Sequence, residues 1–158
     1  MPTRFLLVAA AALAFAAPAW AQSTPVSFSP EFQTALEEDY GVREGEYLRR
    51  SVAEAVNAEL ARRGVSNPGA IDITIVDAEP NRPTMQQMME RPGLDARSIS
   101  IGGAELRATL PTGEVITHRR YNHSLADVAG PATTWTEARR AIRQFAVKVA
   151  DAYIASPR

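Results

Sequence analysis

A long amphipathic pattern near the C-terminus constrains the fold of this chain more than any other feature. Apolar residues recur there at intervals of three and four, the spacing that places side chains on one face of an α-helix. They are Trp135, Ala138, Ile142, Phe145, Val149 and Tyr153. Thr134 and Glu137 have the spacing of a capping box, which predicts that the helix starts there. Burial of one large side chain of such a stripe contributes about 1.5–3 kcal/mol, so we expect the helix to dock on a sheet and fasten the C-terminus.

A second helical pattern covers residues 46–64. Its apolar positions repeat every four residues and form one stripe: Leu48, Val52, Val56 and Leu60. Arg62 and Arg63 stand where positive charge is favourable beside the last carbonyl groups of a helix, and Gly64 is a typical residue just beyond a helix end. We expect a long helix whose apolar face joins the same core.

The residues before this helix predict two short elements. Val26-Ser27-Phe28 alternates as a short edge strand does, and Ser29 and Pro30 are typical of an N-cap and a first helical residue. Apolar residues then follow at helical spacing as far as Tyr40, and Gly41 is predicted to close the segment.

Two further segments are predicted to be strands. Residues 71–76 alternate and are rich in β-branched residues, which indicates one buried and one wetted face. Residues 98–110 also read as a strand, but Ile99 and Ile101 have the opposite parity from Leu106 and would point to the opposite face. A β-bulge at Gly102-Gly103 is predicted to restore the register.

Residues 111–114 are predicted to be the turn of a β-hairpin, with Gly113 at positive φ. If Leu110 faces Val115, Glu105 opposes Arg120 and Arg107 opposes His118 on a charged, wetted face. The other face then gathers Leu110, Val115, Ala108, Thr117, Ala104 and Tyr121.

The order of these elements predicts an α+β fold: a two-layer sandwich with a small mixed sheet of three to four strands and helices on one face. The predicted organisation is a cleavable signal peptide at 1–21, a lead with a short strand and helix at 22–42, and a single α/β domain at 43–155.

The N-terminal residues have the pattern of a secretory signal. Arg4 supplies a positive start, residues 5–17 are apolar, and Ala19 and Ala21 are small residues at the positions that a signal peptidase reads. The apolar run is too short to span a bilayer as a helix. We therefore expect cleavage near Ala21, a periplasmic or secreted location in a bacterium, and no transmembrane anchor in the mature chain.

Composition excludes several classes of function. The chain has no cysteine, which rules out disulfides, thiol catalysis, cysteine metal sites and the lipid of bacterial lipoproteins. The part after residue 21 has 16 basic and 18 acidic residues, a net charge of −2, because Arg4 is the only charged residue before it. Such a balance provides no long-range attraction for nucleic acid.

Sequence motifs for a known chemistry are absent. The chain has neither a phosphate-binding glycine loop nor the pattern G-x-S-x-G. His118 and His123 are five residues apart and point to opposite faces of a continuing strand, so we expect no metal site and no cofactor. Asp77 and Glu79 leave the end of a predicted strand together, and these carboxylates support the alternative of a small secreted hydrolase.

The connection at 77–95 is the remaining candidate site. It holds three prolines and every methionine except the initiator. A short helix over 84–90 is predicted, with Thr84 and Gln87 as a capping box. Long connections in compact domains are often functional, and methionines adapt to varied partners. Either the methionines fill gaps at the sheet edge, or the segment is a partner-binding flap.

The candidate partner-binding surface combines residues 79–95 of this connection with the wetted sheet face, where Glu105 also lies. Arginines at 82, 91 and 97 make an anionic partner conceivable. The residues proposed for partner binding are Arg82, Met85, Met88, Met89, Arg91, Arg107, His118 and Arg120.

The order of four segments resembles secreted proteins of Gram-negative bacteria. These segments are EYLRR…AELARRG, IDITIVDA, SISIGGAELRATL and TTWTEARRAIRQFAVKVAD. The layout, over residues 43–154, is also similar to the small α/β domain of envelope lipoproteins and to the N-terminal part of TolB-type proteins. This resemblance implies a non-catalytic envelope role such as scaffolding or binding. We expect an envelope protein or glycan as the partner. A homo-oligomer that pairs through the edge at 26–28 is a third reading.

Overall fold

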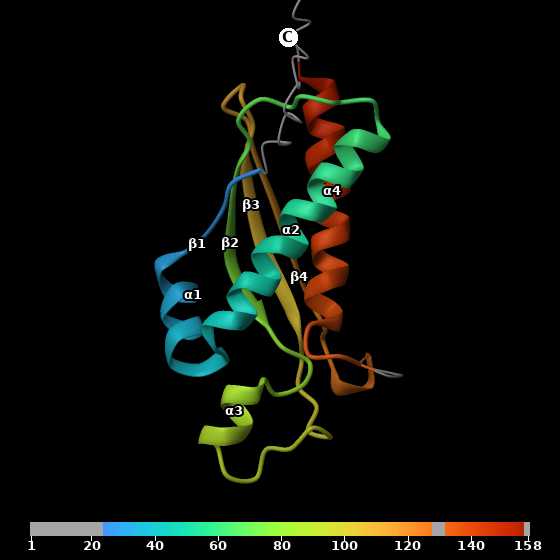
Figure 1. The fold of residues 1–158 in the computed structure, drawn as a ribbon. Coiled ribbons are helices and arrows are strands. Elements are labelled where there is room, and N and C mark those ends of the chain that lie inside the picture. The colour runs from blue at the N-terminus through green and yellow to red at the C-terminus, as the bar shows by residue number, and fades with distance from the viewer. Residues whose placement is uncertain (1–23, 128–131, 157–158) are drawn as a thin grey trace, which may run out of the picture.

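The computed structural model describes residues 24–127 and 132–156, which form a two-layer α+β domain (Figure 1). The predicted signal peptide and its cleavage site lie outside the described residues. The sheet has four strands in the order β1-β2-β3-β4. β1 (Val26–Phe28) is parallel to β2 (Asp72–Glu79), whereas β3 (Gly103–Thr109) is antiparallel to both β2 and β4 (Val115–Tyr121). The predicted small mixed sheet is confirmed.

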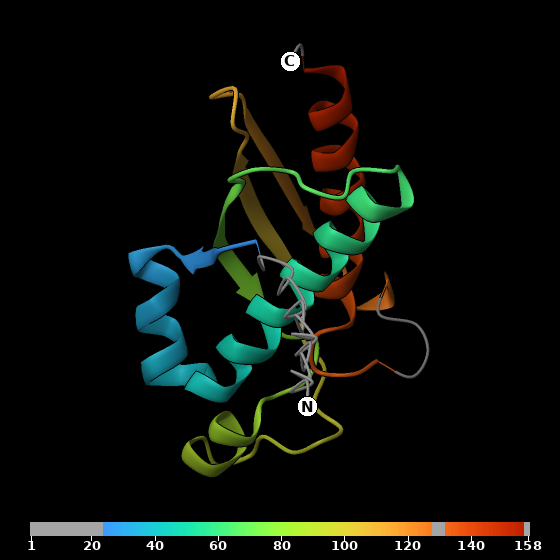
Figure 2. The same ribbon diagram turned by 45° about the horizontal axis from the view of Figure 1, so that its top comes forward.

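Two long helices cover one face of this sheet. α2 (Val42–Arg62) and α4 (Thr136–Ala155) pack against each other, and α4 lies on β3 and β4 (Figures 1 and 2). The predicted apolar stripe of α2 is buried, and that of α4 is buried except for Tyr153, which is partly buried and packs against the core. Phe145 shares this core with Ile73 of β2 and Leu106 of β3. The other face of the sheet carries polar and charged side chains. The predicted sandwich with helices on one face is confirmed.

The lead before α2 packs onto the same core. α1 (Pro30–Ala35) begins as predicted, because the Ser29 hydroxyl accepts a hydrogen bond from the Phe32 N–H at 3.1 Å. It continues into η1 (Leu36–Tyr40), a π-helix of five residues that ends at Gly41, where φ is +103°. Phe32 is buried in the core.

The β3–β4 hairpin has a different register from the predicted one. The Leu110 N–H donates to the carbonyl of Glu114 at 2.9 Å, so Leu110 faces Glu114 and not Val115. The loop is therefore three residues long, and Gly113 adopts a φ of +86° in it. A loop of this length with a left-handed glycine is one of the common hairpin connections.

This shift of one residue reverses the two faces of β4. Glu105 pairs with Arg119 and not with Arg120, and Arg107 is not opposite His118. The prediction that His118 and Arg120 lie on the wetted face is therefore wrong, because both are on the helix side. The wetted face instead receives Val115, Thr117, Arg119 and Tyr121.

The predicted β-bulge at Gly102-Gly103 is also wrong. β3 begins only at Gly103, so the preceding residues belong to the connection. The irregularity lies in the partner strand β2, where the pairing passes from Ile75 directly to Asp77. Val76 is the extra residue.

α4 is capped by a distant residue and not by the predicted box. It begins at Thr136, and Trp135 occupies the N-cap position without a side-chain hydrogen bond. The N–H of Glu137 donates to Asn81 Oδ1 at 2.8 Å, and the N–H of Asn81 donates to the carbonyl of Thr134 at 2.7 Å. Tertiary contact with the segment after β2 therefore satisfies the start of this helix.

The segment between β2 and β3, residues 80–102, is named the flap. It contains α3 (Met85–Glu90) and lies beyond one end of the sheet (Figure 1). The predicted capping box of α3 is confirmed: the Gln87 N–H donates to Thr84 Oγ1 at 3.2 Å, and the Thr84 N–H donates to Gln87 Oε1 at 3.1 Å. η2 (Leu125–Asp127), a short 3₁₀ helix, follows β4.

Candidate functional site

Asp77 and Glu79 lie on the open face of the sheet because of the irregularity at Val76. Simple alternation from the buried Ile75 would turn both carboxylates toward the helices. The extra residue changes the parity, so that Ala78 is the side chain buried in the core, with 0% exposure. Two acidic side chains consequently leave the end of β2 on the same, open face.

Tyr121 reaches these carboxylates from β4. Its hydroxyl donates a hydrogen bond to Asp77 Oδ2. Burial raises the pKa of Tyr121 above its usual value, and the bond and charge of Asp77 raise it further, so the hydroxyl remains a donor. Gly103 of β3 lies between the two strands, and a β-carbon there would be 2.7 Å from Tyr121 Cδ1. The absence of a side chain at Gly103 lets the tyrosine ring cross β3.

Glu79 is the carboxyl of the site whose proton affinity is clearly altered. Its pKa is raised mainly by burial and secondarily by the charge of Asp77, while Arg119 opposes the shift. The guanidinium of Arg119 lies 5.4 Å from the centre of the Tyr121 ring, and its Nε lies 3.6 Å from Glu105 Oε2. Aromatic and carboxylate groups thus alternate along this end of the sheet.

The π-helix contributes a second tyrosine to the site. Burial, followed by the charge of Asp77, raises the pKa of Tyr40 to about 12. The Tyr40 ring packs edge-on against Trp135 with 5.9 Å between ring centres, and the Trp135 Nε1–H donates to Glu44 Oε2 at 2.6 Å. Aromatic packing against the start of α4 therefore fixes this side chain.

Two adjoining cavities meet at Glu79 and Ile101. The larger has a volume of about 620 Å³ and extends around the end of the edge strand β4. The smaller, of about 270 Å³, lies between the flap and η1 and is bordered by Tyr40 and Asp39. Glu79 is therefore reached from both sides.

The larger cavity has walls from both faces of β4. Asp77, Glu79, Arg119 and Tyr121 line it on the open side, and His118 and Arg120 line it on the helix side. Volumes of this size are typical of small-molecule sites, which usually measure about 300–1,000 Å³.

Two residues on the helix side have polar atoms without hydrogen-bond partners among the described residues: His118 at Nε2 and Arg120 at Nε. His118 is only 9% exposed, and its pKa is lowered by burial, then by the charge of Lys148; a hydrogen bond with Gln144 opposes this shift. Nη2 of Arg120 lies 3.7 Å from Glu137 Oε2, a long ion pair.

The arginines predicted for an anionic partner mostly hold the flap in place. Arg82 donates from Nε to the carbonyl of Ala132 at 2.5 Å and from Nη1 to that of Ala96 at 2.9 Å. Nη2 of Arg91 pairs with Asp39 Oδ1 at 2.6 Å, while Asp39 Oδ2 accepts a bond from Gln87 at 3.0 Å. The flap is thus attached to α4 and to η1.

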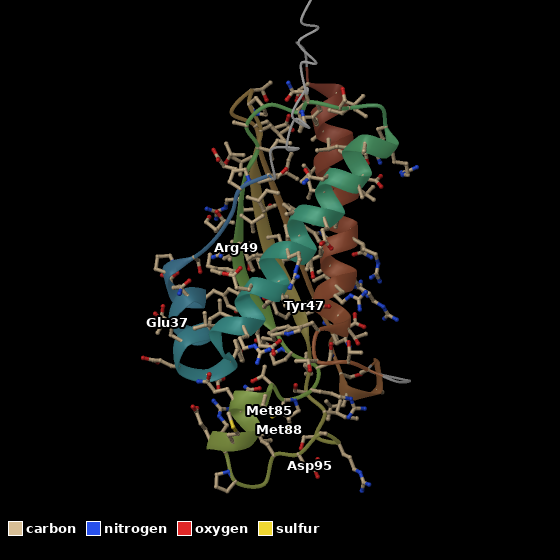
Figure 3. The ribbon with its side chains drawn as sticks, in the orientation of Figure 1. Glu37, Tyr47, Arg49, Met85, Met88 and Asp95 are labelled. Carbon is tan, nitrogen blue, oxygen red and sulfur yellow. The ribbon has the colours of Figure 1, made fainter. Side chains whose placement is uncertain are left out.

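The methionines of α3 are largely on the surface. Met85 is 65% exposed and Met89 is 75% exposed, whereas Met88 is half-buried. Figure 3 labels Met85 and Met88 on α3. Two of the three methionines therefore do not fill gaps in the core. Exposed apolar side chains at neighbouring helical positions are available for contact with a partner.

Three residues of the site were not singled out from the sequence: Tyr40, Arg119 and Tyr121. A three-residue hairpin loop ending in Gly113, a known alternative, would have placed Arg119 and Tyr121 on the open face. Nothing local in the sequence marks Tyr40, because its position depends on the π-helix and on packing against Trp135. Arg107 and Glu105 were correctly placed on the open face.

The described parts of the chain, 24–127 and 132–156, hold no group of three or more His, Asp or Glu side chains that is arranged to hold a metal ion. In the same ranges, each helix is either too short or too polar to cross a membrane.

Together, the fold and the site define a small α+β domain with a polar, tyrosine-lined cavity at one end of its sheet. In comparisons with known proteins, no family model, curated protein or solved structure matches the chain.

Proposed function

We propose that the chain is a non-catalytic binding domain that acts on another component of the bacterial cell envelope, a protein or a glycan. The secretory pattern at residues 1–21 supports a periplasmic or secreted location after cleavage near Ala21. The order of helices and strands over 43–154, similar to that of envelope lipoprotein and TolB-type domains, supports the same role. The chain has no cysteine to carry a lipid, so binding and not anchoring is the role proposed.

One observation carries the binding proposal: the flap bounds a cavity at Glu79 and also exposes two methionines of α3. A partner on this surface would contact the apolar side chains of α3 and reach the polar groups behind them. Burial of Met85 and Met89 supplies affinity, and the carboxylates and tyrosines supply orientation.

The direct test is capture of envelope components from a bacterial periplasmic extract, followed by identification. The Met85→Ser/Met89→Ser variant is expected to lose the specific partner. The matched control is Val42→Ser/Ile154→Ser, because these residues are 61% and 54% exposed on other elements. Equal capture by wild type and both variants would remove the flap from the proposal.

The location is tested independently of the partner. We expect the chain, expressed with residues 1–21 in a Gram-negative host, to be recovered from the periplasm or the medium with a mature N-terminus near Gln22. Mass spectrometry of the intact protein measures this. A full-length chain in the cytoplasm would contradict export.

A small secreted hydrolase is the second candidate, and the raised pKa of Glu79 favours it. A general acid needs a carboxyl that retains its proton near working pH, beside a second carboxylate with a different environment. Asp77, held by the Tyr121 hydroxyl, is that second group.

The two candidates are separated by activity measurements on the purified mature chain. Chromogenic glycosides, esters and peptides are the substrates. A hydrolase would lose turnover in both Glu79→Gln and Asp77→Asn while remaining folded. Absence of turnover in the wild type, together with partner capture, supports the binding domain.

A further inference from the structure

The larger cavity has two ends of opposite charge. Asp77 and Glu79 lie on its open-face side, and Arg120 and His118 lie on its helix side. Because β4 is the edge strand, the cavity passes around the strand and joins both sides. A single small ligand at this edge therefore meets carboxylates at one end and the guanidinium of Arg120 at the other.

The carboxylate end is suited to an ammonium group. Arg119 is the cavity residue whose positive charge opposes the raised pKa of Glu79, and it is already directed to Glu105 and to the ring of Tyr121. Neither Asp77 nor Glu79 takes part in an ion pair among the described residues. The ring of Tyr121 adds a face that attracts cations.

The other end offers the guanidinium of Arg120. The Arg120 side chain is 40% exposed, and the ion pair between its Nη2 and Glu137 Oε2 is long, at 3.7 Å. A guanidinium nitrogen can only donate, so an incoming oxygen is the complementary group, and a carboxylate can accept two parallel hydrogen bonds from it. His118 also lines this end, but burial lowers its pKa, so it adds a polar group and not a positive charge.

We propose that this cavity binds a small zwitterion of the amino-acid or short-peptide type, with its ammonium group at Asp77 and Glu79 and its carboxylate at Arg120. The inference goes beyond the proposed function, because it assigns a ligand to the larger cavity, which adjoins the flap cavity at Glu79. A ligand with only one charge would satisfy one end and leave the other unmatched, so both charges determine specificity.

The test uses trialanine with free termini, its N-acetylated form, its C-terminal amide and the doubly capped form. Binding to the mature protein is measured by titration calorimetry and by shifts of backbone amide NMR signals. Trialanine is expected to bind most tightly. Loss of either terminal charge should raise the dissociation constant about tenfold or more, the change expected for loss of one charged contact. Equal affinity for the doubly capped peptide would overturn the inference.

Two variants assign the two ends. Glu79→Gln should weaken the binding of trialanine about tenfold but leave the affinity for the N-acetylated peptide unchanged. Arg120→Gln should also weaken the binding of trialanine about tenfold but leave the affinity for the C-terminal amide unchanged. Glu54→Gln and Arg143→Gln, on the helical layer and outside this cavity, are the matched controls. If Arg120→Gln unfolds, the selectivity of the wild type among the four peptides still decides the question.

Failure of this inference is distinct from failure of the proposed function. If trialanine does not bind at millimolar concentration while Glu79→Gln abolishes capture of the envelope partner, the proposed binding function at Glu79 is supported and the proposed zwitterionic ligand is wrong. If peptides bind with the expected selectivity but no partner is captured, the ligand class stands and the envelope partner is wrong.

Discussion

The Tyr121 hydroxyl donates its hydrogen bond to Asp77 across an intervening strand, and Gly103 makes this crossing possible. The bond joins β4 to β2 on the open face of the sheet, at the end bounded by the flap. It depends on two features of the strand pairing, the three-residue loop at Gly113 between β3 and β4 and the extra residue at Val76 in β2.

Gly103→Ala is expected to destabilise the fold and displace Tyr121. The new methyl group would lie 2.5 Å from Tyr121 Cα and closer still to the carbonyl of Arg120, so backbone must move. Overpacking of this kind costs about 1–3 kcal/mol. Chemical denaturation measures the loss, and Thr117→Ala, on the exposed face of the same sheet, is the control. An unchanged denaturation midpoint for Gly103→Ala would contradict the close approach of Tyr121 to β3 at Gly103.

Asn81→Ala is expected to lower the free energy of unfolding by about 1–3 kcal/mol, because it removes the acceptor at the start of α4 and leaves a buried N–H unsatisfied. The side chain of Asn81 also donates to the carbonyl of Ser100 at 3.3 Å, so the two ends of the flap lose a common anchor. Hydrogen exchange of the Glu137 amide and of the flap measures both effects. Asn67→Ala, in an exposed loop, is the control; equal protection in the two variants would show that Asn81 is not a cap.

Glu79→Gln is expected to stabilise the protein at neutral pH relative to the wild type. The folded state raises the pKa of Glu79, so the unfolded chain loses its proton first as pH rises above 4.5, and stability falls until the folded pKa is passed. Glu79→Gln has no titrating group at this position and does not lose this stability. Its greater stability than the wild type should disappear below pH 4.5, where Glu79 is protonated in both the folded and the unfolded wild-type chain. Thermal unfolding from acid to neutral pH measures the difference, with Glu54→Gln as control. A Glu79→Gln variant that is less stable than the wild type at pH 7 would contradict the claim that folding desolvates the carboxyl group of Glu79.

Tyr40→Phe is expected to remove one step from the ultraviolet titration of the tyrosines, at about pH 12. The unfolded tyrosine ionises at about pH 10. The folded state holds its proton longer, so Tyr40 makes stability fall between about pH 10 and 12. Alkaline unfolding should therefore begin at higher pH in Tyr40→Phe than in the wild type. Identical titration curves below unfolding would contradict the burial of Tyr40 beside Asp77.

Most elements that depend on near neighbours in the sequence were predicted correctly, although the predicted capping box of α4 was wrong. The stripes of α2 and α4, the Ser29-Pro30 start of α1 and the Thr84–Gln87 box of α3 all follow from spacing within a few residues. Their amphipathic faces also require two layers, because one stripe can be buried only against another apolar surface. The α+β class and the helices on one face therefore follow from the sequence alone.

Which residues meet at the site was decided by the tertiary structure. One residue more or less in the 111–114 turn exchanges the faces of β4, and both turns are compatible with the same local sequence. The pairing of β2 with β3 places the bulge at Val76 and so turns Asp77 and Glu79 outward, while Asn81 caps a helix 56 residues away. The periodicity of a sequence reflects only residues that are near one another along the chain. The turn length, the bulge and the cap are instead decided by the energy of contacts between segments that are distant in the sequence.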